Sequence, residues 1–303
     1  MLLLISNLFT CLCVLLSVAF YTLLERKVLG LAQIRKGPNK VGYWGIFQPL
    51  SDAVKLFIKE SFTPLGGNKF LFSFAPSLSL LLSLSIWYLF PSVFSFYYVV
   101  WGLLLFICIS SLNVYATMIS GWSSNSIYAF LGCIRASAQT ISYEVSMLLI
   151  ILFPSLILFS LSWYEVMNKI FFVSLLMFPV MVIWFISILA ETNRAPFDFA
   201  EGESELVSGF NVEYGSGLFA LLFMAEYASI LFMSMATCVW FFSFCLVSSF
   251  SFLLVTLFFS IMFLVVRGSY PRLRYDYLMT MCWKQFLPFS LCLLMMISLT
   301  MVF

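Results

Sequence analysis

The residues best able to do chemistry are carboxylates crowded into the stretch 191–213. If its middle is helical, Asp198, Glu201 and Glu205 share one face at spacings i, i+3 and i+7. Carboxylates crowded in this way cannot all ionise cheaply, so they titrate as a coupled group that can buffer protons. The acidic residues of the stretch are Glu191, Asp198, Glu201, Glu203, Glu205 and Glu213.

Two further carboxyls, Glu144 and Glu226, stand well inside apolar segments. An ionisable group in a bilayer costs roughly 2.5–3.5 kcal/mol on insertion scales, so it usually faces a wet cavity and serves a proton relay. The alternative for each is a hydrogen-bonded carboxyl that never titrates, and for 191–213 it is a solvated acidic loop. Metal binding is disfavoured because the chain has no His and no EF-hand spacing.

Composition indicates which kind of structure must position these groups. Of the 303 residues, 63% are hydrophobic and 9% are charged, against about 25% charged in an ordinary soluble domain. A soluble fold cannot bury so much apolar surface, so the sequence predicts an all-α polytopic membrane protein. The net charge of +2 and the lack of a long basic run argue against a nucleic-acid partner.

We expect a single membrane domain over residues 1–303 with about eight transmembrane helices. Each is an apolar run long enough to cross a ~30 Å hydrocarbon core, which takes about 20 helical residues. The first is expected to be retained, because it lacks the flanking features of a signal peptide. The predicted spans are 2–24, 70–92, 97–119, 137–160, 170–190, 216–239, 243–266 and 285–303.

The basic residues support this count. With eight spans, the loops 25–69, 120–136, 191–215 and 267–284 face one side of the membrane. Together with the adjoining helix ends they hold 14 of the 15 Lys and Arg residues, and only Lys169 falls on the other side. This positive-inside bias places both termini on the face opposite the charged loops.

Residues 45–62 differ from the predicted spans. Leu50, Val54 and Phe57 recur at helical spacing, while Asp52 and Lys59 lie on other faces. The pattern predicts an interfacial amphipathic helix after the first span. A solvated helix packed on a partner subunit is the alternative.

The sequence contains no convincing cofactor motif. It has no His for haem or the usual zinc sites, and its eight Cys are scattered through apolar stretches. Residues 215–220 match a dinucleotide fingerprint, but they open a predicted span instead of following a strand. We therefore expect the chain itself to bind no metal, flavin or haem.

Several motifs together resemble one known family. The chain is similar to chain 1 of NADH:ubiquinone oxidoreductase, respiratory complex I, in ERKVLGLAQIRKGPNKVG at 25–42, GWSSNSIYAFLG at 121–132, RASAQTISYE at 135–144, ETNRAPFDFAEGESELVSGFNVEY at 191–214 and RGSYPRLRYDYLM at 267–279. The resemblance covers essentially the whole chain.

The resemblance implies a core membrane subunit of a proton-pumping NADH:ubiquinone reductase. Such a subunit forms the ubiquinone access chamber at the foot of the peripheral arm and couples quinone reduction to proton translocation. NADH, FMN and iron–sulfur clusters belong to partner subunits, which share the chamber. Its membrane neighbours are small and antiporter-like subunits and lipid.

The family's functional positions correspond to charged residues of this sequence. The implied quinone-binding residues are Glu25, Arg26, Arg35, Asp52, Arg272 and Arg274. The implied proton path comprises Glu144, Glu191, Asp198, Glu201, Glu203 and Glu226. Implied supporting residues are Arg135, Arg194, Glu205, Glu213 and Tyr227. Tyr227 is expected to be the hydrogen-bonding neighbour of Glu226.

The compartment follows from composition and resemblance together. Abundant Phe and Met (36 and 15 residues) suit an animal mitochondrial protein, although a bacterial plasma-membrane homologue would share the motifs. The expected location is the mitochondrial inner membrane, crossed several times, with charged loops facing the matrix and termini facing the intermembrane space.

Two other functions stay open on the residues alone. A free-standing cation or proton transporter would use the same buried carboxyls, but such transporters usually contain internal repeats, which this sequence lacks. A docking subunit of a membrane-bound hydrogenase would share the one-sided charge distribution without binding quinone. The quinone-chamber motifs favour complex I.

Overall fold

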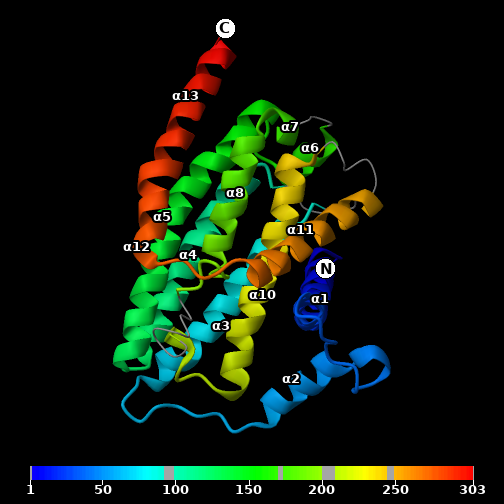
Figure 1. The fold of residues 1–303 in the computed structure, drawn as a ribbon, viewed down its shortest axis with the longest axis vertical. Helices are drawn as coiled ribbons and strands as arrows, with labels where there is room; N and C mark the ends of the chain where they lie inside the picture. The colour runs from blue at the N-terminus through cyan, green and yellow to red at the C-terminus, as the bar shows by residue number, and fades with distance from the viewer. Residues whose placement is uncertain (1, 92–98, 170–172, 200–208, 244–248, 303) are drawn as a thin grey trace.

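The computed structural model describes residues 2–91, 99–169, 173–199, 209–243 and 249–302 (Figure 1). Every regular element in these ranges is helical, which confirms the predicted all-α class. Seven helices of the described residues are long and apolar enough to cross a membrane, and α8 is a shorter apolar helix.

The elements are α1 (Leu2–Ala32), η1 (Tyr43–Gly45), α2 (Gln48–Ile58), α3 (Lys69–Ile86), η2 (Trp87–Leu89), α4 (Gly102–Ser123), α5 (Ile127–Leu158), α6 (Trp163–Asn168), α7 (Val173–Leu176), α8 (Phe178–Glu191), η3 (Gly209–Asn211), α10 (Ser216–Phe241), α11 (Ser249–Ser269), α12 (Tyr275–Met281), the π-helical η5 (Cys282–Phe286) and α13 (Leu287–Val302).

Helix α10 is the central helix of the bundle. It packs against α1, α2, α3 and α11. Helix α4 packs between α3 and α5. Helices α8 and α13 pack on α5, and Figure 1 shows α13, in red, along the outside of the bundle. Because α10 touches elements from both ends of the sequence, its side chains can reach more than one site.

Aromatic side chains fill the interior around α10. The Phe232 ring lies 5.8 Å from Trp87, 5.7 Å from Phe106 and 5.4 Å from Trp163, centroid to centroid. On the outer surface, apolar residues such as Leu8 and Phe9 of α1 remain exposed. This distribution suits a bundle whose solvent is lipid, where the outer face is as apolar as the core.

Several helices extend beyond the predicted spans. Helix α1 continues past residue 24 to Ala32, and α5 begins at Ile127, well before residue 137. Hydropathy marks where side chains leave the lipid, whereas a helix ends only where its backbone is capped or broken. Glu25, Arg26 and Lys27, which directly follow the first predicted span, therefore lie on a helix and have fixed directions.

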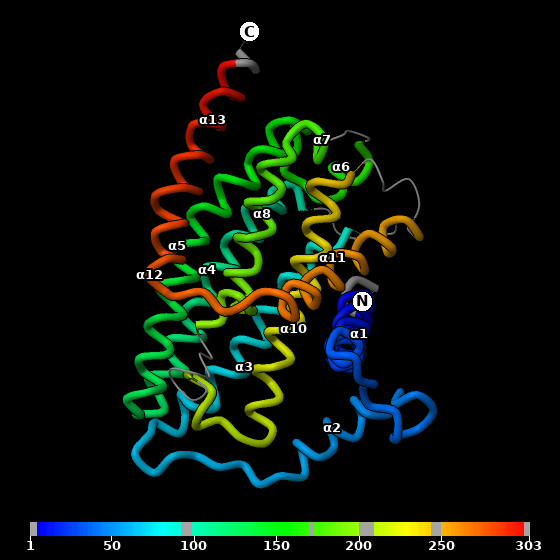
Figure 2. Tube along the Cα trace, in the orientation of Figure 1, coloured from blue at the N-terminus to red at the C-terminus, as the bar shows by residue number. Residues whose placement is uncertain are grey.

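Helix α2 and its connection to α3 shape the charged end of the molecule. Figure 2 shows that the chain leaves α2 and runs along the lower edge of the bundle to α3. Helix α2 packs against α1 and α10, while Leu50, Val54 and Phe57 expose their apolar side chains. The predicted amphipathic segment 45–62 thus contains a helix with one face on the bundle and an apolar face turned outward.

Candidate functional site

A cavity of about 430 Å³ lies between α1, α2 and α10, and it is here called the large cavity. Its walls are mainly apolar, with Leu15 and Val18 on α1 and Phe219 and Phe223 on α10. Its polar lining consists of Thr22, Glu25, Arg26, Asp52, Tyr227 and Arg267. Such a site suits a largely apolar ligand with a polar head.

The Glu25 carboxylate, only 4% exposed, is contacted by three other side chains. The Tyr227 hydroxyl donates to its Oε2 at 2.6 Å, Arg267 forms an ion pair with its Oε1, and Arg194 Nη1 lies 3.7 Å from the same oxygen. The Arg194 guanidinium also lies 4.4 Å from the centroid of the Tyr227 ring. Such partners offset the cost of burying a carboxylate. These four residues, the Glu25 cluster, join α1, α10, α11 and the segment after α8.

A buried glutamine holds the segment after α8 in place. Gln139 of α5 donates through Nε2 to the carbonyl oxygens of Ala190 at 2.8 Å and Phe197 at 2.9 Å. Buried backbone carbonyls need such donors. Residues 190–197, which include Glu191 and Arg194, are therefore fixed against α5.

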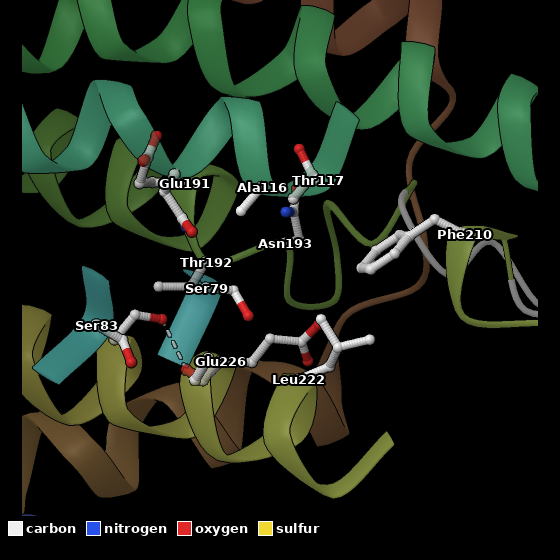
Figure 3. A pocket seen from close by; sticks show the side chains of 13 residues that line it. Ser79, Ser83, Ala116, Thr117, Glu191, Thr192, Asn193, Phe210, Leu222 and Glu226 are labelled. Carbon is white, nitrogen blue, oxygen red and sulfur yellow. Dashed lines mark hydrogen bonds between the residues drawn. The ribbon is translucent and has the colours of Figure 1, made fainter. Parts of the chain in front are cut away.

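A second cavity of about 50 Å³, the small cavity, lies between α3, α4, α10 and the end of α8. Glu191, the last residue of α8, and Glu226, near the middle of α10, line it from opposite sides (Figure 3). No Lys or Arg occurs among its described lining residues. Its hydroxyl and amide side chains are Ser79, Ser83, Asn113, Thr117, Thr192, Asn193 and Ser229.

A third carboxyl near the small cavity is that of Glu144 on α5. Ser110 of α4 donates to Glu144 Oε1 at 3.4 Å. Glu144 also lies close enough to Glu191 for the two charges to repel each other when both are ionised. Helix packing thus places Glu191 and Glu226 at one cavity, with Glu144 of α5 within electrostatic reach of Glu191.

The segment 209–214 closes the small cavity on one side. Phe210 lines the cavity and is buried. Gly132 of α5 permits this approach, because a Cβ there would come within 2.9 Å of the Gly209 Cα. Tyr214 stacks on Phe72 with centroids 4.1 Å apart, and burial raises the pKa of its phenol to about 12. The Tyr214 side chain is therefore a neutral anchor for this segment.

The predicted quinone-binding residues fall into three groups. Glu25, Arg26 and Asp52 line the large cavity, and Arg26 pairs with Asp52 at 2.8 Å. Arg272 lies 3.6 Å from the buried Asp198 of the predicted proton path. The remaining two, Arg35 and Arg274, are exposed and do not line either cavity.

The other predicted residues are placed less closely together. Arg135 is half-buried on α5 and lies within electrostatic reach of Tyr275, and Glu213 is partly exposed in the turn after η3. Glu201, Glu203 and Glu205 lie outside the described residues, so the shared helical face predicted for Asp198, Glu201 and Glu205 stays a prediction.

Tyr227 has a different partner from the one predicted. Its hydroxyl donates to Glu25, not to Glu226. Consecutive residues of a helix point about 100° apart, so Glu226 and Tyr227 face different cavities. The expected hydrogen bond between these two neighbours is wrong, and the two residues instead belong to two separate sites on one helix.

Sequence reasoning missed two residues that matter here. Arg267 ends an apolar span, where a basic residue is ordinary, and its pairing with Glu25 spans 242 residues of sequence. Asn193 lies inside the acidic stretch, but nothing in its type or spacing distinguishes it from a turn residue. Its Oδ1 is nevertheless buried without a hydrogen-bond partner in the described structure.

Metal ligands do not cluster in the described ranges, where no group of three or more His, Cys, Asp or Glu side chains could hold an ion. The seven cysteines of those ranges are all free thiols.

Comparison with known proteins decides the family. The family model described as NADH dehydrogenase matches residues 5–298. The chain belongs to the NADH dehydrogenase family. It is 55% identical over 293 residues to the NADH-ubiquinone oxidoreductase chain 1 of Aedes aegypti, covering 95% of this chain and 92% of the relative. It is 52% identical over 297 residues to that of Heterololigo bleekeri, covering 96% and 95%, and 50% identical over 292 residues to that of Loxodonta africana, covering 93% and 91%. The resemblance to the complex I chain is confirmed.

Proposed function

We propose that this chain is the complex I membrane subunit that forms the ubiquinone access chamber and couples quinone reduction to proton translocation. The single observation that carries the proposal is the placement of Glu226 and Tyr227. These consecutive residues of α10 line the small acidic cavity and the large cavity, respectively. One rigid helix therefore borders both a ligand site and a proton site.

The large cavity supports the quinone part of the proposal. Its apolar walls suit the isoprenoid tail and ring, while Arg267 and Tyr227 offer hydrogen-bond donors to a polar head. The chain supplies binding and orientation. NADH oxidation and electron delivery through FMN and iron–sulfur clusters belong to partner subunits of the complex.

The Glu25 cluster supports the coupling part. Arg267 lines the large cavity and pairs with Glu25, which also lies near Arg194 of the segment after α8. Negative charge on a reduced quinone competes with Glu25 for Arg267. Glu25 then draws more strongly on Arg194, which directly follows Asn193 and lies three residues after Glu191 in the same segment. The charge change is thereby transmitted to the small cavity.

The three carboxyls of the acidic region complete the proposed path. Glu191 and Glu226 share the small cavity, and Glu144 lies within electrostatic reach of Glu191. Protonation of one favours ionisation of its neighbour because like charges repel. Asp198, paired with Arg272, and the acidic residues 201–205 supply protons from the loop side.

We also propose the orientation. The relatives are animal proteins, which places the chain in the mitochondrial inner membrane. The charged loops face the matrix, where the peripheral arm docks, and the termini face the intermembrane space, as the positive-inside bias indicates. Small and antiporter-like membrane subunits and lipid surround the remaining helix faces.

Substitution of the acidic residues in the assembled enzyme tests this function. Purified complex carrying Glu226→Gln or Glu191→Gln, reconstituted in vesicles, should lose coupled NADH:ubiquinone reduction and proton uptake. Glu165→Gln is the matched control, because Glu165 is an exposed carboxyl on α6 that lines neither cavity. Normal turnover and normal pumping in both cavity variants would refute the proposed coupling path.

A further inference from the structure

A hollow of about 420 Å³ lies where the chain turns from α1 towards α2, and it is here called the basic hollow. Its described lining residues are Lys27, Leu31, Lys36, Gly37, Asn39 and Trp44. None of these six residues is acidic, and none lines the large or the small cavity. The volume falls within the roughly 300–1,000 Å³ of ligand pockets, so the basic hollow is large enough to hold a ligand of its own.

A reversal of the chain after α1 builds the first wall of the basic hollow. The Arg35 N–H donates to the Gly30 carbonyl at 2.9 Å, and Ile34 adopts a φ of 58°, the left-handed backbone that commonly ends a helix. The chain then returns along α1, because a Cβ added to Gly37 would come within 3.0 Å of the Lys27 Cα. The two lysines of the hollow thereby line the same space.

Trp44 forms the opposite wall. Lys27 Nζ donates to the Trp44 carbonyl at 2.6 Å and lies 5.9 Å from the centroid of its ring. A lysine ammonium has three hydrogens to donate, so two of them remain for a ligand. Gly45 has a φ of 76°, and a Cβ there would meet the Pro38 carbonyl oxygen, so glycine allows this turn to close. The Lys27 ammonium is therefore held at the edge of the hollow.

The charges that line the basic hollow are all of one sign. The carboxylates that precede and follow this segment are engaged elsewhere, because Glu25 pairs with Arg267 and Asp52 pairs with Arg26. Lys36 is exposed, and no Asp or Glu occurs among the described lining residues. An ammonium donates hydrogen bonds and accepts none. The hollow therefore favours an anionic ligand.

The surroundings of the basic hollow indicate a membrane surface. The hollow directly follows α1, which is long and apolar enough to cross a membrane, and the next helix, α2, turns an apolar face outward. Leu31, Ile34 and Trp44 are strongly exposed, and exposed Trp beside several lysines is typical of the headgroup level of a bilayer. Figure 2 shows the segment between α1 and α2 projecting from the bundle beside α2. A ligand that is partly apolar suits these surroundings.

We propose that the basic hollow binds the phosphate of an anionic phospholipid. Lys27 and Lys36 hold the phosphate oxygens as compact point charges, and the acyl chains leave past Leu31 into the bilayer. An acidic segment of a partner subunit would satisfy the same charges, but the exposed apolar side chains around the hollow favour the lipid. No residue of the proposed proton path lines the hollow, so this lipid site goes beyond the proposed function.

Photo-cross-linking in the assembled enzyme tests the site. The purified complex is placed in phosphatidylcholine nanodiscs that contain a subsaturating amount of photoactivatable phosphatidylglycerol, and labelled peptides are identified by mass spectrometry. The label should fall on residues 27–44 and be displaced by unlabelled phosphatidylglycerol. Labelling should fall about fivefold in Lys36→Gln and about thirtyfold in the double variant with Lys27→Gln and Lys36→Gln, the factors expected for one and two lysines near an anionic lipid.

Two further variants separate charge from structure. Lys36→Arg keeps the charge and should be labelled like the native complex. Lys69→Gln is the matched control, because Lys69 is an exposed lysine at the start of α3 that does not line the basic hollow, and it should leave labelling unchanged.

Three results would overturn the lipid site. The first is native labelling of residues 27–44 that is absent, or that persists in the double variant. The second is displacement of the label by inorganic phosphate as effective as that by phosphatidylglycerol, since the hollow would then bind a free anion. The third is a carbodiimide cross-link between Lys36 and an acidic residue of another subunit in the native complex, since a protein segment would then occupy the hollow.

Discussion

The large and small cavities share helix α10 but differ in how their charges are compensated. In the large cavity Glu25 contacts Arg267, and Arg26 pairs with Asp52. No Lys or Arg occurs among the described residues that line the small cavity with Glu191 and Glu226. Opposite charges around a carboxylate favour its ionised form, whereas an apolar or acidic surrounding favours its neutral form. The difference supports the proposal that the large cavity binds the ligand and the small cavity transfers protons.

Two consecutive residues of α10 reach the two cavities. Tyr227 reaches Glu25 in the large cavity, and Glu226 reaches the small cavity. Because side chains of consecutive residues diverge by about 100°, α10 keeps the two environments apart while holding them at a fixed distance. The difference between the cavities is therefore best tested by substitutions that change the charges of one cavity and leave those of the other intact.

Loss of Glu25 is expected to have the largest effect. Glu25→Gln leaves Arg194 and Arg267, whose side chains are 11% and 35% exposed, without their shared counter-ion. Removing one partner of a buried ion pair costs about 3–5 kcal/mol. The thermal midpoint of the assembled enzyme and its ubiquinone reductase activity should both fall sharply. Asp276→Asn is the control, because its pair with Arg274 is exposed and worth about 0–1 kcal/mol. Equal effects would show that the Glu25 cluster is not a compensated buried unit.

The fold class and most helices could be predicted from the sequence because lipid imposes a simple rule on composition. Apolar runs of sufficient length indicated α3, α4 and α10, and the periodic pattern at 45–62 indicated α2. The rule concerns side chains in lipid, so it gave no reason for α1 to continue to Ala32 or for α5 to begin at Ile127. Those extensions are what give Glu25 and Arg135 fixed directions.

The candidate site was less accessible because its contacts join distant parts of the chain. Glu144 and Glu226 were noticeable as lone carboxyls in apolar segments, yet no spacing showed that Glu226 shares a cavity with Glu191. Arg267 and Asn193 had ordinary residue types at ordinary positions. Helix rotation decides such contacts, and a single sequence with little amphipathic contrast does not define that rotation.

Gln139 tests whether the segment between the cavities must be held rigidly. Gln139→Leu removes the donor from the carbonyls of Ala190 and Phe197, at a cost of about 1–3 kcal/mol for unsatisfied buried acceptors. Hydrogen exchange across 190–199 should accelerate, and pumping per electron should fall more than quinone reduction does. Gln285→Leu, at an exposed glutamine of η5, is the control. Unchanged exchange would mean that other contacts hold the segment.

Tyr227→Phe should affect the large cavity alone. It removes the hydrogen bond to Glu25 Oε2, and a bond to a charged group contributes about 1.5–3 kcal/mol. The KM for ubiquinone should rise about tenfold, while protons pumped per electron stay constant because Glu226 is untouched. Tyr21→Phe is the matched control, since its hydroxyl donates to the Ser260 carbonyl instead. A fall in pumping stoichiometry with unchanged KM would place Tyr227 in the proton path and remove the distinction between the cavities.

Asp52→Asn should have the smallest effect. Asp52 pairs with Arg26 at 2.8 Å, but their side chains are 34% and 50% exposed, so the pair contributes about 0–1 kcal/mol and is screened by salt. Asparagine keeps the oxygen that accepts from Gln48, and only the charge is lost. We expect less than about a fivefold rise in the KM for ubiquinone at low ionic strength, and convergence with the native enzyme at high salt. A larger rise that persists at high salt would make Asp52, not Glu25, the main charged anchor of the large cavity. Only a charge that is buried away from water escapes screening by salt.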